Sequence, residues 1–321
     1  MGKGLPRRRD RRVRRSWLEK SRRSTPKRVN PVTSGTIDHA STRSKTRCTV
    51  SAERAPRGID PSKPHPARRY NYWLGGKDNF QADRVSGEAV ASGFPTIRHA
   101  AIENRRFMQR AVRYLAEEEG IRQFLDVGTG LPSAGNVHEI AQEIDPASRI
   151  VYVDNDPIVL VHARALLTSS PEGATAYLDS DLREPRRILA DPALHKTLDL
   201  TEPVALMLVA ITHFLTDEDD AYGTVRTLVD ALAPGSFVVI TNATQDHLTP
   251  EERAAVDEAN QRSGIPFRNR SADEVARFFD GLDLLAPGVG SVIDWRPDPA
   301  RDDHAPTVKQ VSMHGAVARV P

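Results

Sequence analysis

The sequence predicts an α/β fold built on a parallel, doubly wound sheet. From residue 123 onward, short apolar segments alternate with helical segments of about 10–15 residues, an order typical of parallel sheets. The segment 204–211 is apolar without alternation, as expected for a strand that is covered on both faces. An apolar strand also leads directly into Gly128-Thr129-Gly130, a tight turn of the kind that begins a nucleotide-binding unit.

The chain divides by charge into a basic tail and a mildly acidic body. Residues 1–57 hold 18 Lys and Arg against four Asp and Glu, a net charge of +14, and the rest of the chain carries −12. The tail has few apolar residues to offset the entropy of ordering, so we predict that it is disordered. Two interpretations stay open: an arm that contacts nucleic acid or an acidic partner, or a solvated extension, including upstream sequence translated from a misplaced start codon.

Residues 58–120 predict an N-terminal helical cap, which precedes an α/β domain at 121–321. Mostly apolar residues of the cap recur three and four positions apart, so they share one face of a helix that Gly120 ends. These residues are Ile97, Ala101, Asn104, Met108, Ala111, Val112 and Leu115.

In the α/β domain, the predicted strands are 124–127, 150–153, 176–178, 204–211, 237–241, 282–285 and 310–320. The predicted helices are 133–144, 157–167, 219–232, 250–262 and 271–279. Pro132 suits the first position of the first helix, where a missing N–H costs nothing. Ser271 and Glu274 have the spacing of a capping box before the last helix.

Acidic residues stand at the ends of three predicted strands. Asp126 precedes the glycine turn, Asp154 ends the second strand, and Asp181 follows the third. A carboxylate that ends the second strand can accept hydrogen bonds from both hydroxyls of a ribose. Asp181 can accept a bond from the exocyclic amine of an adenine, and the backbone N–H of Leu182 can donate to a ring nitrogen.

The charge of this site favours S-adenosylmethionine (SAM) over a dinucleotide. Ser133 occupies the sixth position, where the dinucleotide motif G-x-G-x-x-G has glycine. Asp126 would repel a pyrophosphate, whereas it suits the ammonium group of SAM, which carries no phosphate. The sequence also has no G-x-x-x-x-G-K-[ST] motif, which excludes a P-loop NTPase.

The order of these motifs resembles that of class I SAM-dependent methyltransferases. More specifically, the chain is similar to the actinobacterial SAM-dependent methyltransferase family long known as the domain of unknown function DUF574. The stretches that carry the resemblance are 66–80, 103–107, 123–139, 151–157 and 180–185, with Leu232-Ala233-Pro234-Gly235 before the fifth strand. The resemblance implies a Rossmann-like sheet of seven strands with an antiparallel last strand, SAM at the carboxyl ends of the strands, and a helical element over the site.

The chain departs from the family pattern at several positions. Asn71 stands where an aspartate is expected, Trp73 where a leucine is expected, and Thr212 where a leucine usually precedes the histidine. The ending at 313–319 matches a glycine-richer pattern only loosely. Because the first two changes lie in the cap, they bear on substrate fit or cap closure more than on SAM binding.

The cap offers further candidate ligands. Tyr70 or Tyr72 could place an aromatic face near the cationic sulfur, and Lys77 or Arg105 could meet the SAM carboxylate. The alternatives are a helix–turn packing element for 70–80 and a solvated helix face for Arg105. The predicted cofactor-binding residues are therefore Asp126, Gly128, Thr129, Gly130, Asp154, Asn155, Asp181, Leu182, Ala210, Tyr70, Tyr72, Lys77 and Arg105.

His213 is the one candidate catalytic residue. It follows the fourth strand at the rim where ligands bind in such sheets, and an imidazole titrates near neutral pH, so it could deprotonate an acceptor. The alternative is a structural histidine bonded to a backbone carbonyl. The histidines show no metal-binding spacing, and Cys48 is the only cysteine, so we predict neither a metal nor a disulfide.

These observations predict a SAM-dependent methyltransferase that acts on a small-molecule acceptor, with nucleic acid contacted only through the tail. Two alternatives are a non-catalytic regulatory protein that binds SAM or S-adenosylhomocysteine (SAH), and an NAD(P)-dependent oxidoreductase. The longest apolar run has eight residues, against about 20 for a membrane span, so we expect a cytoplasmic protein without membrane contact. The sequence does not indicate an oligomeric state.

Overall fold

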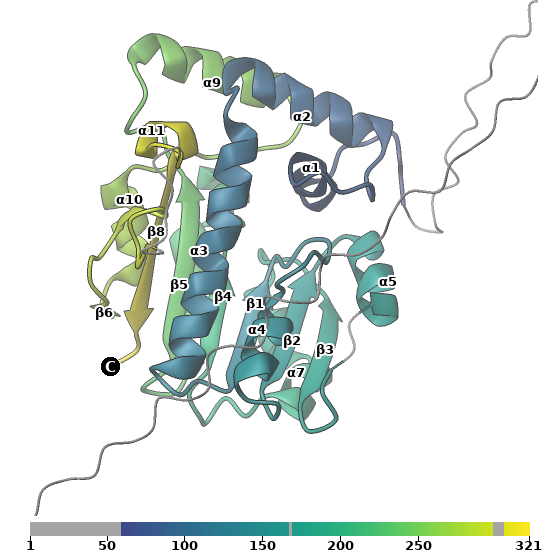
Figure 1. Ribbon diagram of the computed structural model, residues 1–321, viewed down its shortest axis with the longest axis vertical. Coiled ribbons are helices and arrows are strands. Elements are labelled where there is room, and N and C mark those ends of the chain that lie inside the picture. The colour runs from purple at the N-terminus through teal and green to yellow at the C-terminus, as the bar shows by residue number, and fades with distance from the viewer. Residues whose placement is uncertain (1–58, 167–168, 298–304) are drawn as a thin grey trace, which may run out of the picture. The chain divides into compact units, whose positions relative to one another are not determined.

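An eight-stranded mixed sheet forms the centre of the computed structural model, which describes residues 59–166, 169–297 and 305–321 (Figure 1). Seven strands follow the order β3-β2-β1-β4-β5-β8-β6, and β7 pairs with β8. Strands β1 to β5 are parallel, whereas β8 runs antiparallel to β5. Their bounds are β1 Gln123–Val127, β2 Arg149–Asp154, β3 Ala174–Asp179, β4 Ala205–Leu208, β5 Phe237–Ala243, β6 Asp283–Leu284, β7 Gly290–Ser291 and β8 Met313–Arg319.

This topology confirms the predicted fold class. The seven-strand path with an antiparallel β8 is the arrangement that the resemblance implied, and each predicted strand overlaps an observed one. The two-residue strand β7 was not predicted, because Gly290 and Ser291 carry no apolar pattern. The predicted tail at 1–57 lies outside the described residues.

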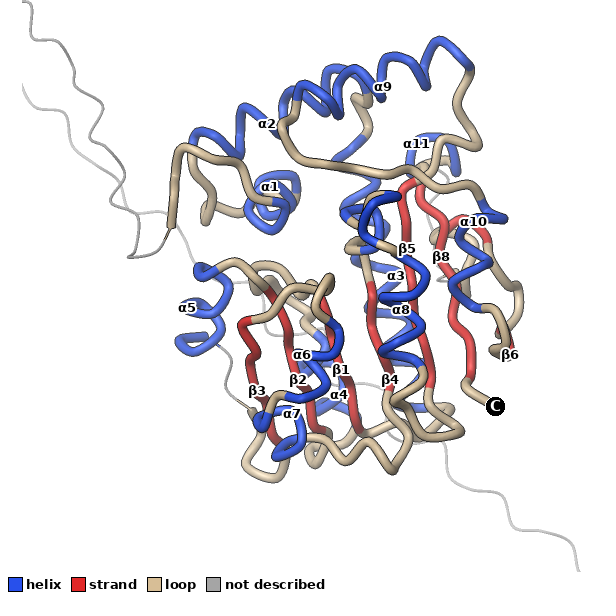
Figure 2. The backbone as a smooth tube through the Cα atoms, turned by 180° about the vertical axis from the view of Figure 1, so that it is seen from behind, coloured by secondary structure: helices blue, strands red, loops and turns tan. Residues whose placement is uncertain are grey.

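Helices cover both faces of the sheet. In Figure 1, α3 lies in front of the sheet, and Figure 2 shows α8 and α6 in front of the opposite face. The bounds are α1 Pro66–Trp73, α2 Gln81–Gly93, α3 Ile97–Glu117, α4 Val137–Ile144, α5 Pro157–Leu166, α6 Pro185–Ala190, α7 Pro192–Thr197, α8 Ala221–Val229, α9 Pro250–Arg262, α10 Ala272–Ala276 and α11 Val308–Val311. Short 3-10 turns add η1 Thr212–Phe214, η2 Asp217–Asp219 and η3 Arg277–Phe279.

Alternate side chains of each central strand enter two separate cores. Phe124 of β1 packs with α3 and α4, whereas its neighbour Leu125 packs with residues of α6, α7, α8 and α10. Because side chains of a strand point alternately to opposite faces, Asp126 shares the face of Phe124 and is directed toward α3. The two-sided core thus determines on which face of the sheet the carboxylate lies.

The cap over the sheet is made by α1, α2 and α9. Figures 1 and 2 both show α2 and α9 side by side, beyond the carboxyl ends of the parallel strands. Helix α3, which we predicted as part of the cap, instead runs along the sheet, and α9 comes from the second half of the chain. The buried Ser86 of α2 donates its hydroxyl to the carbonyl of Ser263, 2.7 Å away, and thereby joins the two cap helices.

Two predicted elements near the site are wrong at their ends. The strand predicted over 204–211 stops at Leu208, because Ala210 adopts a left-handed φ of 57° and donates its N–H to the hydroxyl of Thr241, 2.8 Å away. The helix predicted from Ser133 begins only at Val137, where Asn136 and Glu139 form a capping box. Pro132 is therefore in a loop and not in the first helical turn.

The predicted strand at 310–320 is also wrong in its first residues. Thr307 and Gln310 form a capping box that begins the short helix α11, and the strand starts only at Met313. The capping box predicted at Ser271 and Glu274 is confirmed and begins α10. In the described part of the chain, no helix combines the length and apolarity of a membrane span.

Substitution of Trp295 tests its packing against α3. Its ring is fully buried and meets the rings of Phe107 and Tyr114 edge-on, with centroids 5.4 and 5.8 Å away. Trp295→Ala should lower the free energy of unfolding by about 3–5 kcal/mol, because it leaves a large cavity. Trp295→Phe should cost clearly less, since the indole N–H has no partner among the described residues. Urea denaturation measures both, and equal losses in the two variants would contradict this packing.

Candidate active site

A cavity of about 410 Å³ lies between the carboxyl ends of the parallel strands and the cap. Its walls come from the loops after β1, β2, β3 and β4, from α1 and α3, and from residues 264–267 before α10. The predicted site residues that line it are Asp126, Gly128, Thr129, Gly130, Asp154, Asn155, Asp181, Leu182, Ala210, Tyr70, Arg105 and His213. The structure thus brings together residues that are spread over 144 positions of the sequence.

The loop after β1 is formed by two glycines in left-handed conformations. Gly128 has φ 77°, and a Cβ there would lie 2.6 Å from the side chain of Ile211. Gly130 has φ 68°, and a Cβ there would meet no atom within 4 Å. At Gly128, the close side chain of Ile211 leaves no room for a Cβ. At Gly130, the left-handed conformation favours glycine, and the space beside it is open. This combination allows a ligand to approach the backbone of the loop.

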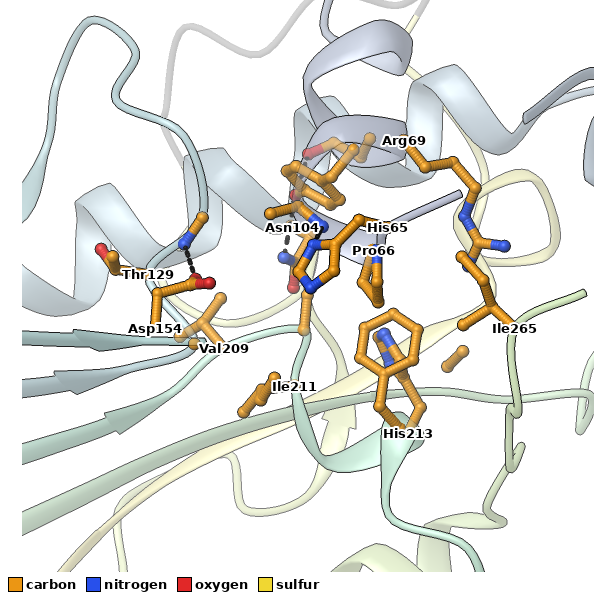
Figure 3. Close-up of a pocket in the computed structure, with 18 of the residues that line it drawn as sticks. His65, Pro66, Arg69, Asn104, Thr129, Asp154, Val209, Ile211, His213 and Ile265 are labelled. Carbon is orange, nitrogen blue, oxygen red and sulfur yellow. Dashed lines mark hydrogen bonds between the residues drawn. The ribbon is translucent and has the colours of Figure 1, made fainter. Parts of the chain in front are cut away.

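Asp154 is buried at the end of β2, where its carboxylate holds the glycine loop in place. One oxygen accepts the N–H of Gly130 at 2.8 Å, a bond drawn in Figure 3, and the other accepts the N–H of Asp156 at 2.9 Å. Burial raises the pKa of Asp154, although these two bonds oppose the shift. A carboxylate has about four acceptor positions, so Asp154 retains capacity for two hydroxyl donors.

Asp126 is buried on the neighbouring strand without an ion pair among the described residues. Its carboxylate accepts the hydroxyl of Thr129 at 2.8 Å. Burial raises the pKa of Asp126 to about 6, and the bond from Thr129 and the charge of Arg105 limit that rise. A cationic ligand group at this position would add to the partial charge compensation that Arg105 supplies.

Arg105 of α3 lines the cavity with its guanidinium joined to the loop before α4. Its Nη2 donates to the carbonyls of Ser133 and Ala134 at 2.9 and 3.1 Å, and to the side chain of Asn136 at 3.1 Å. The side chain is therefore not a solvated helix face, as one interpretation had it. It positions the loop and contributes positive charge near Asp126.

Asp181 and Asn155 form the corner of the site beyond β3. The amide of Asn155 donates to Asp181 at 2.7 Å, and Arg183 binds the same carboxylate through its backbone N–H and its guanidinium. Leu182 is buried beside them. This corner offers one apolar face and a hydrogen-bonded polar edge, which suits a flat nitrogen heterocycle.

The cap residues predicted to bind the cofactor do not behave alike. The Tyr70 hydroxyl donates to the carbonyl of Ala101 at 2.8 Å and accepts the amide of Asn104 at 3.1 Å. Tyr72 lies outside the cavity lining and donates its hydroxyl to Glu88. Lys77 is exposed in the loop after α1 and does not line the cavity. Of the predicted cofactor ligands, Tyr72 and Lys77 therefore do not line the cavity, since the Tyr72 hydroxyl is bound to Glu88 and Lys77 lies in the exposed loop that follows α1.

His213 lies in η1 at the cavity wall, enclosed by the rings of Phe214 and Phe267 at 4.4 and 4.5 Å between centroids. Its Nδ1 is buried without a hydrogen-bond partner in the described part of the chain, so the alternative of a histidine bonded to a backbone carbonyl is not what the structure shows. Burial, together with the charges of Arg69 and Arg270, lowers the pKa of His213 to about 3. The imidazole is therefore neutral at physiological pH.

Contacts of His65 and Arg68 that sequence reasoning missed connect the cap to the loop after β2. His65, which caps α1, lies 3.2 Å from Asn155 and 3.1 Å from the carboxylate of Asp156. Arg68 approaches the same Asp156 carboxylate to 3.4 Å. Burial acts to raise the pKa of Asp156, but the His65 bond and nearby charges lower it overall. Pro66 signals a helix start in the sequence, but no pattern indicates what His65 contacts.

Comparison with known proteins identifies the family. Residues 52–321 match the family model described as S-adenosyl methyltransferase. The chain belongs to the S-adenosyl methyltransferase family. This assignment decides against the NAD(P)-dependent oxidoreductase and against a non-catalytic binding protein, and it makes SAM the cofactor. A search of curated proteins gives no match to this methyltransferase.

Two solved structures resemble this methyltransferase over most of its length. A DUF574 family protein from Streptomyces avermitilis MA-4680 is 46% identical with a TM-score of 0.78, and the match covers 82% of this chain and 99% of that one. A Thermobifida fusca YX protein named as a methyltransferase is 39% identical with a TM-score of 0.74, with 83% and 98% covered. Both confirm the resemblance found in the sequence.

The residues of the cavity fit SAM. Asp154 retains acceptor capacity for a ribose, Asp126 is a buried carboxylate without a direct ion pair among the described residues, and Gly130 borders open space. The cofactor carries a hydroxylated ribose and an ammonium group, and it has no phosphate that these carboxylates would repel.

Protonation of Asp126 should control the affinity for SAH, whose ammonium favours the ionised carboxylate. With a pKa of about 6, the carboxylate is protonated at lower pH, so binding at pH 5 should be about tenfold weaker than at pH 7.5. Asp126→Asn should bind more weakly at pH 7.5 and lose most of this pH dependence. Calorimetric titration at both pH values measures the effect.

The stability of Asp126→Asn toward unfolding provides an independent control. A carboxyl whose pKa is higher in the folded than in the unfolded chain favours folding at low pH and opposes it increasingly as pH rises from about 4 to 6. Asp126→Asn should therefore unfold at an equal or higher urea concentration at pH 7.5, with a gain of up to about 3 kcal/mol. A variant that is less stable and keeps the wild-type pH profile would contradict the assignment.

Proposed function

We propose that this methyltransferase transfers the methyl group of SAM directly to a small-molecule acceptor that binds beneath the cap. The observation that carries the proposal is that one cavity joins two chemically different halves. The carboxylates at the strand ends form one half. The other half is mostly apolar and is closed over by α1 and residues 264–267. It is lined by Trp73, Val90, Ile97, Met108, Phe214, Ile265, Phe267 and Met313.

In this proposal, the strand-end residues hold the cofactor. Asp154 accepts bonds from the ribose hydroxyls, Asp126 compensates the ammonium group, and the corner of Asp181 and Leu182 receives the adenine. When bound, SAM supplies a methyl group on a positively charged sulfur, which needs no further activation. The work left to the protein is to align the acceptor and to exclude water.

The apolar half of the cavity suits a small acceptor. The whole cavity, including the side proposed for SAM, measures about 410 Å³, which falls in the range of small-molecule sites, and the walls of its apolar half are largely hydrophobic and aromatic. The bonds from His65 to the loop after β2 connect the cap to the Asp154 region, so the cap and the cofactor side form one enclosure. Enclosure favours a molecule that enters the cavity whole over a segment of a macromolecule.

The environment of His213 argues for a positioning role and against a general base. A base of pKa about 3 has little affinity for the proton that an acceptor would release. Because Nδ1 is buried, only Nε2 of the neutral ring can donate or accept a hydrogen bond at the cavity wall. We therefore keep His213 as a residue that orients the acceptor.

Replacement of Asp154 tests the cofactor site. Asp154→Ala should weaken SAH binding about tenfold or more, because it removes the ribose acceptor and releases the N–H of Gly130. Asp179→Ala is the matched control, since this exposed carboxylate ends β3 opposite Asp154 in the register and does not line the cavity. Calorimetry should show unchanged affinity for the control, and an unchanged affinity of Asp154→Ala would contradict the assignment.

Transfer of label tests the class of acceptor. Extracts of actinobacterial cells are incubated with the full chain and methyl-tritiated SAM, and are then separated into small molecules, protein and nucleic acid. Label should enter the small-molecule fraction and be lost with Asp154→Ala. Label confined to protein or nucleic acid would overturn the proposed acceptor class.

The protonation state of His213 can be measured directly by NMR. The ring signal that disappears in His213→Asn should not titrate between pH 5 and 8, because burial and two nearby arginines disfavour the imidazolium. The remaining histidine signals provide the internal reference. Titration of this signal near pH 6.5 would restore the general-base interpretation.

A further inference from the structure

Arg69 is a buried cation in the wall of the cavity, and no carboxylate of the described residues is bound to it. Its side chain is 1% exposed. Nη1 donates to the hydroxyls of Ser263 and Ser86 at 3.2 and 3.4 Å, and Nε has no partner among the described residues. A buried charge with only neutral partners is costly, so such groups are usually paired. Burial accordingly lowers the pKa of Arg69 to about 10.

The nearest acidic residue of the cap does not fill this role. The negative charge of Asp83 favours the ionised form of Arg69, but its carboxylate is already bound elsewhere. It accepts the backbone N–H groups of His65 and Phe80, both at 2.8 Å, and lies 3.4 Å from the guanidinium of Arg68. Arg68 is thus the partner of Asp83, and Arg69 is left without an anion.

The other arginine near His213 is committed to the protein. Arg270 donates to the backbone carbonyls of Thr212 and Leu215 at 2.8 Å, and to the side chain of Asn242 at 3.1 Å. These bonds hold η1 in place. In contrast to Arg270, Arg69 lines the cavity, and Figure 3 shows its side chain reaching from α1 toward Ile265.

Trp73 stacks against Arg69, and further aromatic side chains line the same cavity. The guanidinium of Arg69 stacks over Trp73 at 4.9 Å from the ring centroid, and both residues line the cavity. His213 lies in the same half of the cavity, across from Asp154 and Thr129 in Figure 3, and packs against Phe214 and Phe267. Because His213 is neutral, it does not compete with Arg69 for an anion. One cation among flat apolar walls suits a flat molecule with one negative charge.

We propose that the acceptor of this methyltransferase is a small aromatic carboxylic acid, whose carboxylate binds Arg69 and whose ring packs between Trp73 and Phe267. This proposal rests on the proposed function, because it names the class of molecule that enters the cavity beside SAM. It also gives Arg69 the negative partner that the protein does not supply.

The test compares acids with their neutral amides on the full chain saturated with SAH. The probes are 4-hydroxybenzoate with 4-hydroxybenzamide, indole-3-carboxylate with its carboxamide, and 3-phenylpropanoate with its amide. Calorimetry should show that at least one acid binds about tenfold or more tightly than its amide, because only the acid forms a charged pair with Arg69. This comparison needs no variant, so it is not affected by folding defects.

Variants then assign the preference to Arg69. Arg69→Met should remove the preference for the acid, and Arg69→Lys should retain part of it. Arg98→Met is the matched control, because Arg98 is exposed, stacks over Tyr72 outside the cavity, and should keep the wild-type preference. Melting curves and SAH affinity verify that each variant is folded.

Two outcomes would overturn the proposal: no acid that binds more tightly than its amide, or a preference that survives in Arg69→Met. Failure of the proposed function has a different signature, which is label from SAM confined to protein or nucleic acid in the transfer experiment. Because the comparison of acids and amides measures binding and not transfer, the two results remain separate.

Discussion

Two carboxylates, Asp126 and Asp154, are buried side by side at the carboxyl ends of neighbouring parallel strands, and neither forms an ion pair within the described residues. Burial raises the pKa of both groups, which means that the fold is less favourable when they are ionised. A site that carries such a cost in the absence of its ligand is stabilised when a ligand of opposite charge binds. The buried negative charge of these two carboxylates therefore favours a cofactor that is cationic and carries no phosphate.

The opposite half of the cavity also holds a buried charge, but there the charge is positive. Arg69 is buried without an anion, while the neighbouring His213 is kept neutral. One end of the cavity thus favours a positive group and the other a negative one. Such a gradient would orient a cationic cofactor and an anionic acceptor in a defined way relative to each other. The contacts of His65 with Asn155 and Asp156 link the cap, which carries Arg69, to the loop that carries Asp154.

The sheet could be predicted from the sequence because its strands are short apolar runs that end at polar residues. The same signal located the glycine loop, Asp126, Asp154 and Asp181, since the ends of parallel strands meet at one edge. The left-handed residue Ala210, which shortens β4, was not predictable, because alanine rarely adopts this conformation. The late start of α4 was missed because Pro132 resembles a first-turn residue, whereas the capping box lies at Asn136 and Glu139.

The cap residues were harder to predict, because a charged side chain looks the same in the sequence whether it is buried or exposed. Arg69 and Lys77 both lie in the stretch 66–80, yet one lines the cavity and the other is exposed. Only the packing of α1 beneath α2 and α9 decides between them. For this reason Tyr72 and Lys77 were predicted as ligands, and His65 and Arg69 were overlooked.

The most direct test of the account is a crystal structure of the full chain grown with SAH. In that structure, the ribose hydroxyls should lie within hydrogen-bond distance of Asp154, the ammonium group beside Asp126, and the adenine at Asp181 and Leu182. SAH bound elsewhere, or the same compound in this cavity with Asp126 and Asp154 turned away from it, would contradict the central claim.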